Sequence, residues 1–544
     1  MRFTGFPDAN GTGIMQPEQT QAKSGNTPER ENRPRSASAL TERAGGVLLH
    51  ITSLPSPWGV GDVGACAREF VSRLQRAGQR YWQVLPLNPV DAIADESPYF
   101  SSSAMAGNPL LLELQGLVED GLLSPAEVTA PVAEDTGHAD YARARALKYP
   151  LLERAQRRFG ERGESAEYVA FCQREAYWLE DYALFSAIKS EHSGVWSDWP
   201  RGLRDREPEA LAGVRARLAP VIAREKRWQF FFFSQWGKLR AHAAAHGVLL
   251  FGDTPIYVSF DSADVWAHPC LFQLDAEQRP LAVSGVPPDY FSATGQLWNN
   301  PLYDWETLQA SGYRWWRERM AALLRRFDLV RIDHFRGLAQ YWSVPVHADS
   351  AIDGEWRDVP SEDLFDTLIR ELDSFPVVAE DLGTITPDVI ALRDHYGIPG
   401  MLVLQFAFGD DHADNPYVPE NHEENAIAYL GTHDNDTLLG WLQTAVDAAA
   451  RERLCRYIDC AGDDVALVSR LIALLLSSPA RVAIVTAQDL LALPGSARMN
   501  NPGQRGGNWR WQLTSAQWQA LTLDSLAELA RQTGRFVGAG PGGN

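Results

Sequence analysis

The segment FDLVRIDHFRG, residues 327 to 337, decides the expected fold. An apolar run ends there with Arg331, Asp333 and His334 within four positions. Continuous Val, Ile and Leu runs are typical of strands that helices cover on both faces, as in a parallel sheet. Buried charge is costly unless it is paired or used. The charged end of this run therefore predicts a polar site at one edge of a parallel sheet.

Seven further apolar runs repeat this pattern along the chain. With the first, they cover residues 45–50, 81–87, 247–253, 327–333, 375–381, 400–408, 426–434 and 481–489. Helical patterns such as GACAREFVSRLQRAG and SEDLFDTLIREL lie between the runs. Eight strand and helix units predict an α/β fold of the (β/α)8 TIM-barrel type.

The spacing of the runs predicts where the barrel is elaborated. A long interval with helical patterns separates the second and third runs, so we expect a helical insertion at about 91–245. A lid-bearing insertion is expected at about 259–326. Residues 1–44 are rich in Pro, Gly, Ser and charge, which predicts a disordered tail before a catalytic barrel of residues 45–544.

Composition limits the class of partner. The 544 residues carry 50 Lys and Arg against 70 Asp and Glu, a net charge of -20 that argues against nucleic acid as a partner. We see no signal-peptide pattern and no apolar stretch of membrane-spanning length. The five cysteines lack CxxC spacing and predict neither disulfides nor a zinc site. We expect a cytoplasmic protein without membrane contact, cofactor or metal.

Acidic side chains end several of the runs. Asp253, Asp333, Glu380 and Asp434 each follow an apolar run, at the barrel face where catalytic groups gather. Alternation along the strand puts Arg331 and Asp333 on one face, where the cation can hold the anion ionised. Retaining glycoside transfer needs a nucleophilic carboxylate and a second, protonated carboxyl group about 5 to 5.5 Å away. Asp333 and Glu380 are the candidates, and nearby negative charge should raise the pKa of Glu380.

Each of these clusters also has an ordinary structural explanation. The RxD pattern is often a structural ion pair, AEDLG is compatible with a helix N-cap, and THD with a hydrogen-bonding or metal cluster. Asp333, Glu380 and Asp434 end three of the runs in the order Asp, Glu, Asp, and together they favour one catalytic site over three unrelated structural roles.

The motifs resemble a known family. RIDHFRG (331–337), AEDLG (379–383) and GTHDNDT (431–437) resemble catalytic strand ends of the α-amylase superfamily. In detail they are similar to the amylomaltases, or 4-α-glucanotransferases, of glycoside hydrolase family 77. The likeness continues through HITSLPSPWGVGDVG (50–64), SPYFSSSAMAGNP (97–109), GVPPDYFSATGQLWNNPLYDW (285–305) and ARMNNPGQRGGNWRWQL (497–513).

The resemblance implies a role for each matching residue. Asp333 would be the nucleophile, Glu380 the general acid and base, and Asp434 the group that holds sugar hydroxyls. The residues implied to line the donor glucose subsite are Tyr99, which would stack there, Asp253, Arg331, His334, His433 and Asn500. Tyr290, Phe291 and Trp298 are implied to contact the acceptor from a loop over the cleft.

Three positions depart from the family pattern. Asn299 stands where Gly is common, Gln504 stands where Thr is common, and QDLLALPGSARMN (488–500) is looser than usual. All three carboxylates are retained, so the departures bear on acceptor preference and lid motion.

The resemblance implies that the chain moves α-1,4-glucan segments between maltodextrins through a covalent glucosyl-aspartate, without a cofactor. Two alternatives stay open. One is an α-amylase-like hydrolase that uses the same carboxylates, and the other is an inactive glucan-binding protein.

Overall fold

The computed structural model describes residues 40–132, 135–288, 293–409, 413–460, 462–504 and 506–538. Most of the predicted tail, residues 1–39, lies outside the described residues. Leu40 is fully buried and the first strand begins at Ala44. The first barrel strand thus begins one residue before position 45, which was expected from composition.

Eight parallel strands form the sheet, in the order β10-β11-β12-β1-β2-β3-β6-β9. Each overlaps one of the eight predicted runs, so the predicted fold class is confirmed. The strands are β1 (Ala44–Leu48), β2 (Tyr81–Gln83), β3 (Leu249–Pro255), β6 (Leu329–Asp333), β9 (Val377–Ala379), β10 (Gly400–Val403), β11 (Ala426–Tyr429) and β12 (Val482–Thr486). Their inward side chains, among them Phe251, Leu329, Ile427 and Tyr429, form a core inside the barrel.

A side chain completes the ring between β9 and β10. The amide of Ala379 donates to the carbonyl of Pro399 at 2.9 Å. One residue beyond Glu380, the Asp381 carboxylate accepts from the amide of Met401 at 2.8 Å and from Arg393 at 2.7 Å. Asp381 therefore takes the place of a ladder hydrogen bond at the seam, directly beside a predicted catalytic acid.

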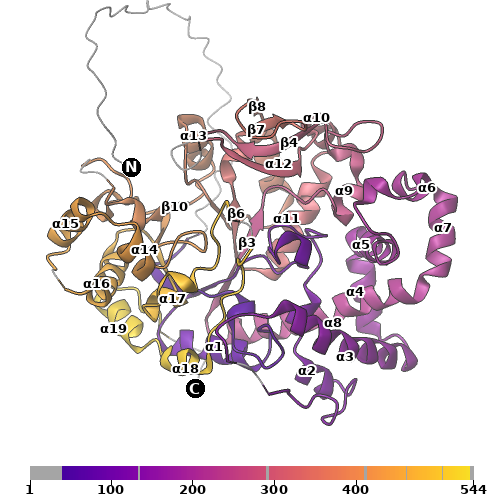
Figure 1. The fold of residues 1–544 in the computed structure, drawn as a ribbon, viewed down its shortest axis with the longest axis horizontal. Coiled ribbons are helices and arrows are strands. Elements are labelled where there is room, and N and C mark those ends of the chain that lie inside the picture. Colours follow the sequence, from indigo (N-terminus) through magenta and orange to yellow (C-terminus); the bar gives the residue numbers. More distant parts are fainter. Residues whose placement is uncertain are drawn as a thin grey trace, which may run out of the picture. The chain divides into compact units, whose positions relative to one another are not determined.

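Helices pack around the strands (Figure 1). In α1 (Ala65–Arg76) the apolar residues Ala67, Phe70, Val71 and Leu74 are buried, which is the spacing of one helix face. The other helices that follow barrel strands are α11 (Arg314–Arg326), α12 (Ser361–Glu371), α13 (Pro387–His395), α14 (Leu438–Thr444), α15 (Ala448–Tyr457), α16 (Asp464–Ser477), α17 (Ala487–Leu490), α18 (Ser515–Ala520) and α19 (Asp524–Gln532).

One strand and helix unit differs from the prediction. Between β10 and β11 the described residues form only two short 3-10 helices, η7 (Leu404–Phe406) and η8 (Pro419–Asn421). This interval contains Pro416 and Pro419. Proline removes a backbone donor and disfavours helix interiors, which accounts for the missing helix.

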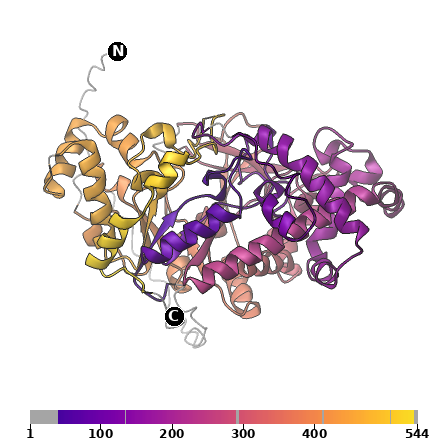
Figure 2. The same cartoon turned by 90° about the horizontal axis from the view of Figure 1, so that it is seen from below.

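The interval between β2 and β3 is largely helical, and Figures 1 and 2 show its helices on the opposite side of the strands from α14 to α19. Its helices are α2 (Leu114–Glu119), α3 (Tyr141–Glu161), α4 (Ala166–Arg174), α5 (Ala176–Lys189), α6 (Arg201–Arg204), α7 (Pro208–Arg217) and α8 (Ala219–Ala245). Two ion pairs hold α3 to loops at the barrel mouth. Arg145 bonds Glu96 at 2.5 Å, and the buried Lys148 lies 3.6 Å from Asp62.

A second sheet was not predicted. Four antiparallel strands run in the order β5-β4-β7-β8, namely β4 (Ala282–Val286), β5 (Gln296–Pro301), β7 (Gln340–Pro345) and β8 (Glu355–Asp358). The first two leave the barrel after β3, with the short helices α9 (Ala263–Ala267) and α10 (Trp305–Ala310), and the last two follow β6. The sheet thus joins two loops on the face where the acids lie.

No helix among the described residues is long and apolar enough to cross a membrane.

Candidate active site

The predicted acids stand at the same end of the barrel. Asp253 lies within β3, Asp333 ends β6, Glu380 directly follows β9, and Asp434 follows β11 by five residues. Because the strands are parallel, these positions meet at one edge of the sheet. The arrangement predicted from the runs is therefore present.

Arg331 links two of these acids. Its Nη1 donates to Asp253 Oδ1 and Oδ2 at 2.9 and 2.7 Å, and its Nη2 donates to Asp333 Oδ1 at 2.7 Å. The Arg331 side chain is 3% exposed, whereas that of Asp333 is 28% exposed. One guanidinium thus pairs with a buried carboxylate on one side and with a carboxylate that reaches solvent on the other. Asp333 Oδ2 is the oxygen that Arg331 leaves free.

The electrostatic environment raises the pKa of Asp333 above its ordinary value. Burial is the largest cause, and the negative charges of Glu380, Asp253 and Asp434 act in the same direction. Arg331 opposes them. The pH at which Asp333 loses its proton therefore depends on Arg331.

Glu380 is held by backbone amides. Its Oε2 accepts from the amide of His334 at 2.7 Å, and its Oε1 accepts from the amide of Leu382 at 3.1 Å. His334 has φ 53°, a left-handed conformation that costs a non-glycine residue about 1 to 2 kcal/mol. Because this turn directs the His334 amide at Glu380, the residue after the candidate nucleophile also contacts the candidate acid.

The pKa of Glu380 is also raised, mainly by burial, while Arg331 and the two amides oppose the shift. The direction agrees with the prediction, although burial is the largest cause. Among negative neighbours, Asp381 contributes, and Asp333 and Glu380 repel each other when both are charged. Neighbouring acids with raised pKa values titrate as a unit, which favours one shared proton near neutral pH.

Asp434, Asn500, His433 and Tyr99 form the second part of the site. Asn500 Nδ2 donates to Asp434 Oδ1 at 2.6 Å, and the Asn500 amide donates to the carbonyl of His433 at 3.0 Å. The Tyr99 hydroxyl donates to Asp253 Oδ2 at 2.6 Å and lies 2.9 Å from His433 Nε2. Since that hydroxyl hydrogen goes to Asp253, we assign the hydrogen of neutral His433 to Nε2.

The Tyr99 ring lies parallel to that of His433, with centroids 5.4 Å apart. Burial lowers the pKa of His433 and so favours its neutral form. A continuous chain of hydrogen bonds runs from Tyr99 through Asp253 and Arg331 to Asp333.

Of the three residues predicted to contact the acceptor, Trp298 lies within the described residues. It lies on β5 and packs edge-on against His334, with ring centroids 4.7 Å apart. Tyr290 and Phe291 lie outside the described residues. Asn299 has φ 63°, the left-handed region, and its side chain is exposed. Asn adopts this conformation more readily than most residues, so it is compatible with a position where Gly is common.

Comparison with known proteins agrees with this geometry. Residues 49–517 match the model of the glycoside hydrolase family 77, described as 4-alpha-glucanotransferase. This chain belongs to the 4-α-glucanotransferase family. It is an enzyme with 4-α-glucanotransferase activity.

Relatives of the glucanotransferase match along nearly their whole length. The 4-alpha-glucanotransferase of Thermus thermophilus is 48% identical over 504 residues, 91% of this chain and 99% of its own. That of Synechocystis is 45% identical over 500 residues, 90% of this chain and 98% of its own. The amylomaltase from Streptococcus agalactiae, solved in complex with acarbose, has a TM-score of 0.87 and 36% identity, and the match covers 91% of this chain and all of that one.

Sequence reasoning missed two residues at this face of the glucanotransferase, Arg498 and His50. Arg498 Nε donates to the carbonyl of Asn500 at 2.7 Å, and its Nη2 donates to the carbonyl of Asp434 at 2.5 Å. It therefore holds both partners of the Asp434–Asn500 pair through their backbones. Its place two residues before Asn500 was the only signal in the sequence.

His50 was also not predicted. It follows β1 at the same barrel face and is 5% exposed, and its Nδ1 accepts from the amide of Leu85 at 3.2 Å. Burial lowers its pKa to about 3, so it is neutral. The signal available was a histidine directly after an apolar run.

Within the described ranges, no group of three or more His, Cys, Asp or Glu side chains is arranged to hold a metal ion.

Proposed function

We propose that this glucanotransferase moves α-1,4-glucan segments between maltodextrins by a retaining double displacement through a covalent glucosyl-aspartate. The observation that carries the proposal is the contact between Arg331 and Asp333, with Glu380 bonded to the amide of the next residue. These contacts at the barrel mouth support Asp333 as the nucleophile and Glu380 as the proton donor.

In the first step, Glu380 gives its proton to the glycosidic oxygen while Asp333 attacks the anomeric carbon. Arg331 occupies Asp333 Oδ1, so Oδ2 is the attacking oxygen. The glycosidic bond breaks, a β-glucosyl ester forms on Asp333, and the released sugar carries the proton. The shared proton of the two acids matches the requirement for one ionised and one protonated carboxyl group.

In the second step, Glu380 acts as a base and removes the proton from the 4-hydroxyl of an acceptor glucan. The acceptor oxygen attacks the anomeric carbon and the ester bond to Asp333 breaks. Two inversions restore the α configuration. Asp434, oriented by Asn500, would bind hydroxyls of the same glucose as its ring flattens.

Tyr99, Asp253, His433 and His334 would line the donor subsite. Tyr99 and Asp253 hold each other through the hydroxyl bond, so their oxygen atoms are already oriented before sugar binds. Burial lowers the pKa of His334 to about 3, and the neutral ring suits a hydrogen bond to an uncharged sugar.

Transfer must compete with hydrolysis. Water is about 55 M and an acceptor about 5 mM, so transfer needs an advantage of roughly 5.5 kcal/mol to break even. Trp298, together with Tyr290 and Phe291, would provide that advantage by stacking on acceptor sugars and displacing water. No cofactor takes part in either step, and a cytoplasmic location stays a prediction.

Incubation with maltotriose tests the proposed substrate class. We expect glucose and longer oligomers without a net gain in reducing ends. A steady rise in reducing ends would point to hydrolysis instead, and an unchanged substrate would mean that the chain only binds glucan.

Trapping tests the intermediate. Glu380→Gln with α-maltosyl fluoride, whose leaving group needs no acid, should accumulate an adduct on Asp333 that peptide mass spectrometry locates. Asp333→Asn is the matched control and should give no adduct. An adduct on another residue would remove Asp333 from the mechanism.

A further inference from the structure

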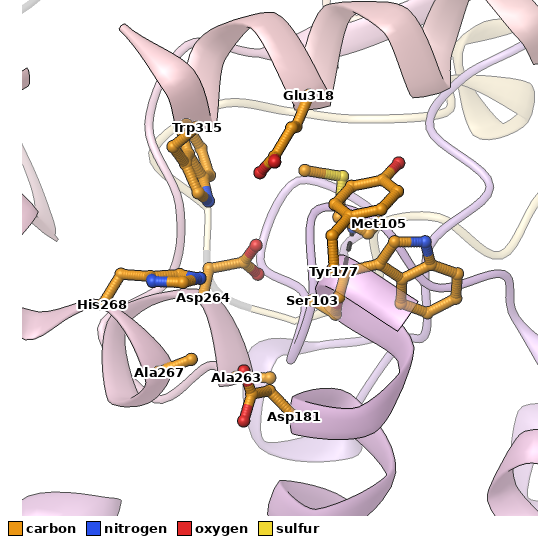
Figure 3. Close-up of a pocket in the computed structure, with 11 residues that line it drawn as sticks. Ser103, Met105, Tyr177, Asp181, Ala263, Asp264, Ala267, His268, Trp315 and Glu318 are labelled. Atoms are coloured by element: carbon orange, nitrogen blue, oxygen red, sulfur yellow. Dashed lines mark hydrogen bonds between the residues drawn. The ribbon is translucent and has the colours of Figure 1, made fainter. Parts of the chain in front are cut away.

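A small pocket lies where α5, α9 and α11 meet, apart from the predicted site residues (Figure 3). Asp264, at the start of α9, extends its carboxylate into it, and Trp315 and Glu318 face the same space from α11. Asp264 is 6% exposed. A buried carboxylate is costly unless it is bonded, so its partners indicate its role.

The bonded partner of Asp264 belongs to the loop that carries Tyr99. Asp264 Oδ2 accepts from the amide of Ala104 at 2.7 Å, and the amide of Ala263 donates to the carbonyl of Ser102 at 2.8 Å. The start of α9 therefore holds the segment that follows Tyr99 by three to five residues. Ser101 Oγ donates to the carbonyl of Pro89 at 2.7 Å within the same β2–α2 connection. The connection is also held away from Tyr99, at Glu96 by Arg145 and at Gly107 by Gln229.

The residues that follow Asp253, the partner of Tyr99, are held by a buried cation. Arg319 on α11 is 1% exposed and donates to the carbonyl of Ile256 at 3.0 Å and to Thr254 Oγ1 at 2.9 Å, at the end of the strand that carries Asp253. Arg319 acts electrostatically on Asp264 and opposes the rise in pKa that burial causes. The buried Asp264 therefore holds the loop that carries Tyr99, and the buried Arg319 holds the residues that follow Asp253.

We propose that Asp264 is a positioning residue for donor binding, which holds the 102–104 segment on α9 and so keeps the Tyr99 hydroxyl on Asp253. The inference rests on the proposed donor-subsite role of Tyr99. It explains why a carboxylate is buried between a helix and a loop that are distant in the sequence.

The test compares Asp264→Ala, Asp264→Asn and Tyr99→Phe by kcat/KM for maltotriose. Asp264→Ala should lower kcat/KM about tenfold, the effect of losing one hydrogen bond to a buried carboxylate. Asp264→Asn keeps an acceptor oxygen for Ala104 and should stay within about threefold of the parent. Asp264→Ser, whose hydroxyl stops short of Ala104, replaces the alanine variant if that does not fold, with the same expected loss.

A double-mutant cycle separates positioning from general destabilisation. If Asp264 acts through Tyr99, Asp264→Ala should cost less than about twofold in the Tyr99→Phe background, because coupled residues are not additive. Glu225→Ala is the matched control, since Glu225 is also 6% exposed but pairs with Arg224 at 2.6 Å in the helical insertion. It should change thermal stability without changing kcat/KM.

Three results would overturn the inference. Additive losses in the double variant would show that Asp264 does not act through Tyr99. An Asp264→Asn variant as impaired as the alanine variant would show that the hydrogen bond is not what matters. A Tyr99→Phe variant with parental kcat/KM would remove the proposed donor role of Tyr99 as well, whereas the first two results leave that role standing.

Discussion

Replacing Arg331 with Met should shift the pH dependence of catalysis. The Nη2 to Oδ1 distance of 2.7 Å corresponds to about 6 kcal/mol of attraction at an effective dielectric of about 20. Asp333 is 28% exposed, so solvent screens much of this attraction, and we take a net loss of about 2 kcal/mol. Because one pKa unit corresponds to about 1.4 kcal/mol, the pKa of Asp333 should rise by at least about one further unit.

The assay is kcat/KM for maltotriose from pH 5 to 9. We expect the acidic limb of the profile to move to higher pH by at least about one unit. At pH 7 the activity should fall about tenfold or more, and the ratio of parent to variant should narrow toward pH 9 as Asp333 ionises. Arg331→Lys keeps the charge but cannot span both acids, so its shift should be smaller.

Stability must be measured in parallel, because the variant leaves Asp253 buried without its cationic partner at a cost of about 3 to 5 kcal/mol. Arg73→Met is a suitable control, since Arg73 is 7% exposed and its guanidinium donates to the carbonyls of Trp518 and Leu521 at 2.5 and 2.9 Å. It should lower Tm without moving the pH profile. An Arg331→Met profile that falls equally at every pH would refute the claim that Arg331 lowers the pKa of Asp333.

Three further predictions follow from the site. Asp333→Asn should be inactive, and its free energy of unfolding should increase relative to that of the parent as the pH rises from about 4 to 8. The expected gain is about 1.4 kcal/mol per unit by which folding raises the pKa of Asp333, because ionising this acid increasingly destabilises the folded parent. Urea unfolding at both ends of that pH range measures the difference, and a difference that does not change with pH would contradict the prediction. Asn500→Ala should lower kcat/KM about 10- to 100-fold with little change in Tm, because it removes the 2.6 Å hydrogen bond to Asp434. A variant with the kcat/KM of the parent would mean that Asp434 does not need the Asn500 hydrogen bond to act. Phe291→Ser and Trp298→Ala should each raise the ratio of reducing ends to transferred glucose, and an unchanged ratio would refute water exclusion by these side chains.

Much of the barrel could be predicted because its signals are local. Eight apolar runs mark eight strands, since a strand covered on both faces must be apolar along its length. The acids that end these runs had to meet, because parallel strands share one C-terminal edge. The placement of Asp253, Asp333 and Glu380 needed no further information.

Other features depend on contacts between distant segments. The antiparallel sheet was missed because β4 pairs with β7 across two separate loops, and neither short strand is recognisable without its partner. The described residues between β10 and β11 lack the expected helix for a local reason, the prolines in this interval, which the prediction did not weigh.

The sequence by itself determined which residue types stand at the strand ends, because apolar periodicity and the position of charge are written along the chain. Only the tertiary structure decided which charges pair. Arg331 bridges Asp253 and Asp333, Asp381 closes the seam beside Glu380, and Arg498 holds Asp434. Hydrogen bonds and desolvation act over a few ångströms in space, whatever the separation in sequence, so these partners and the raised pKa values appear only when the chain is folded.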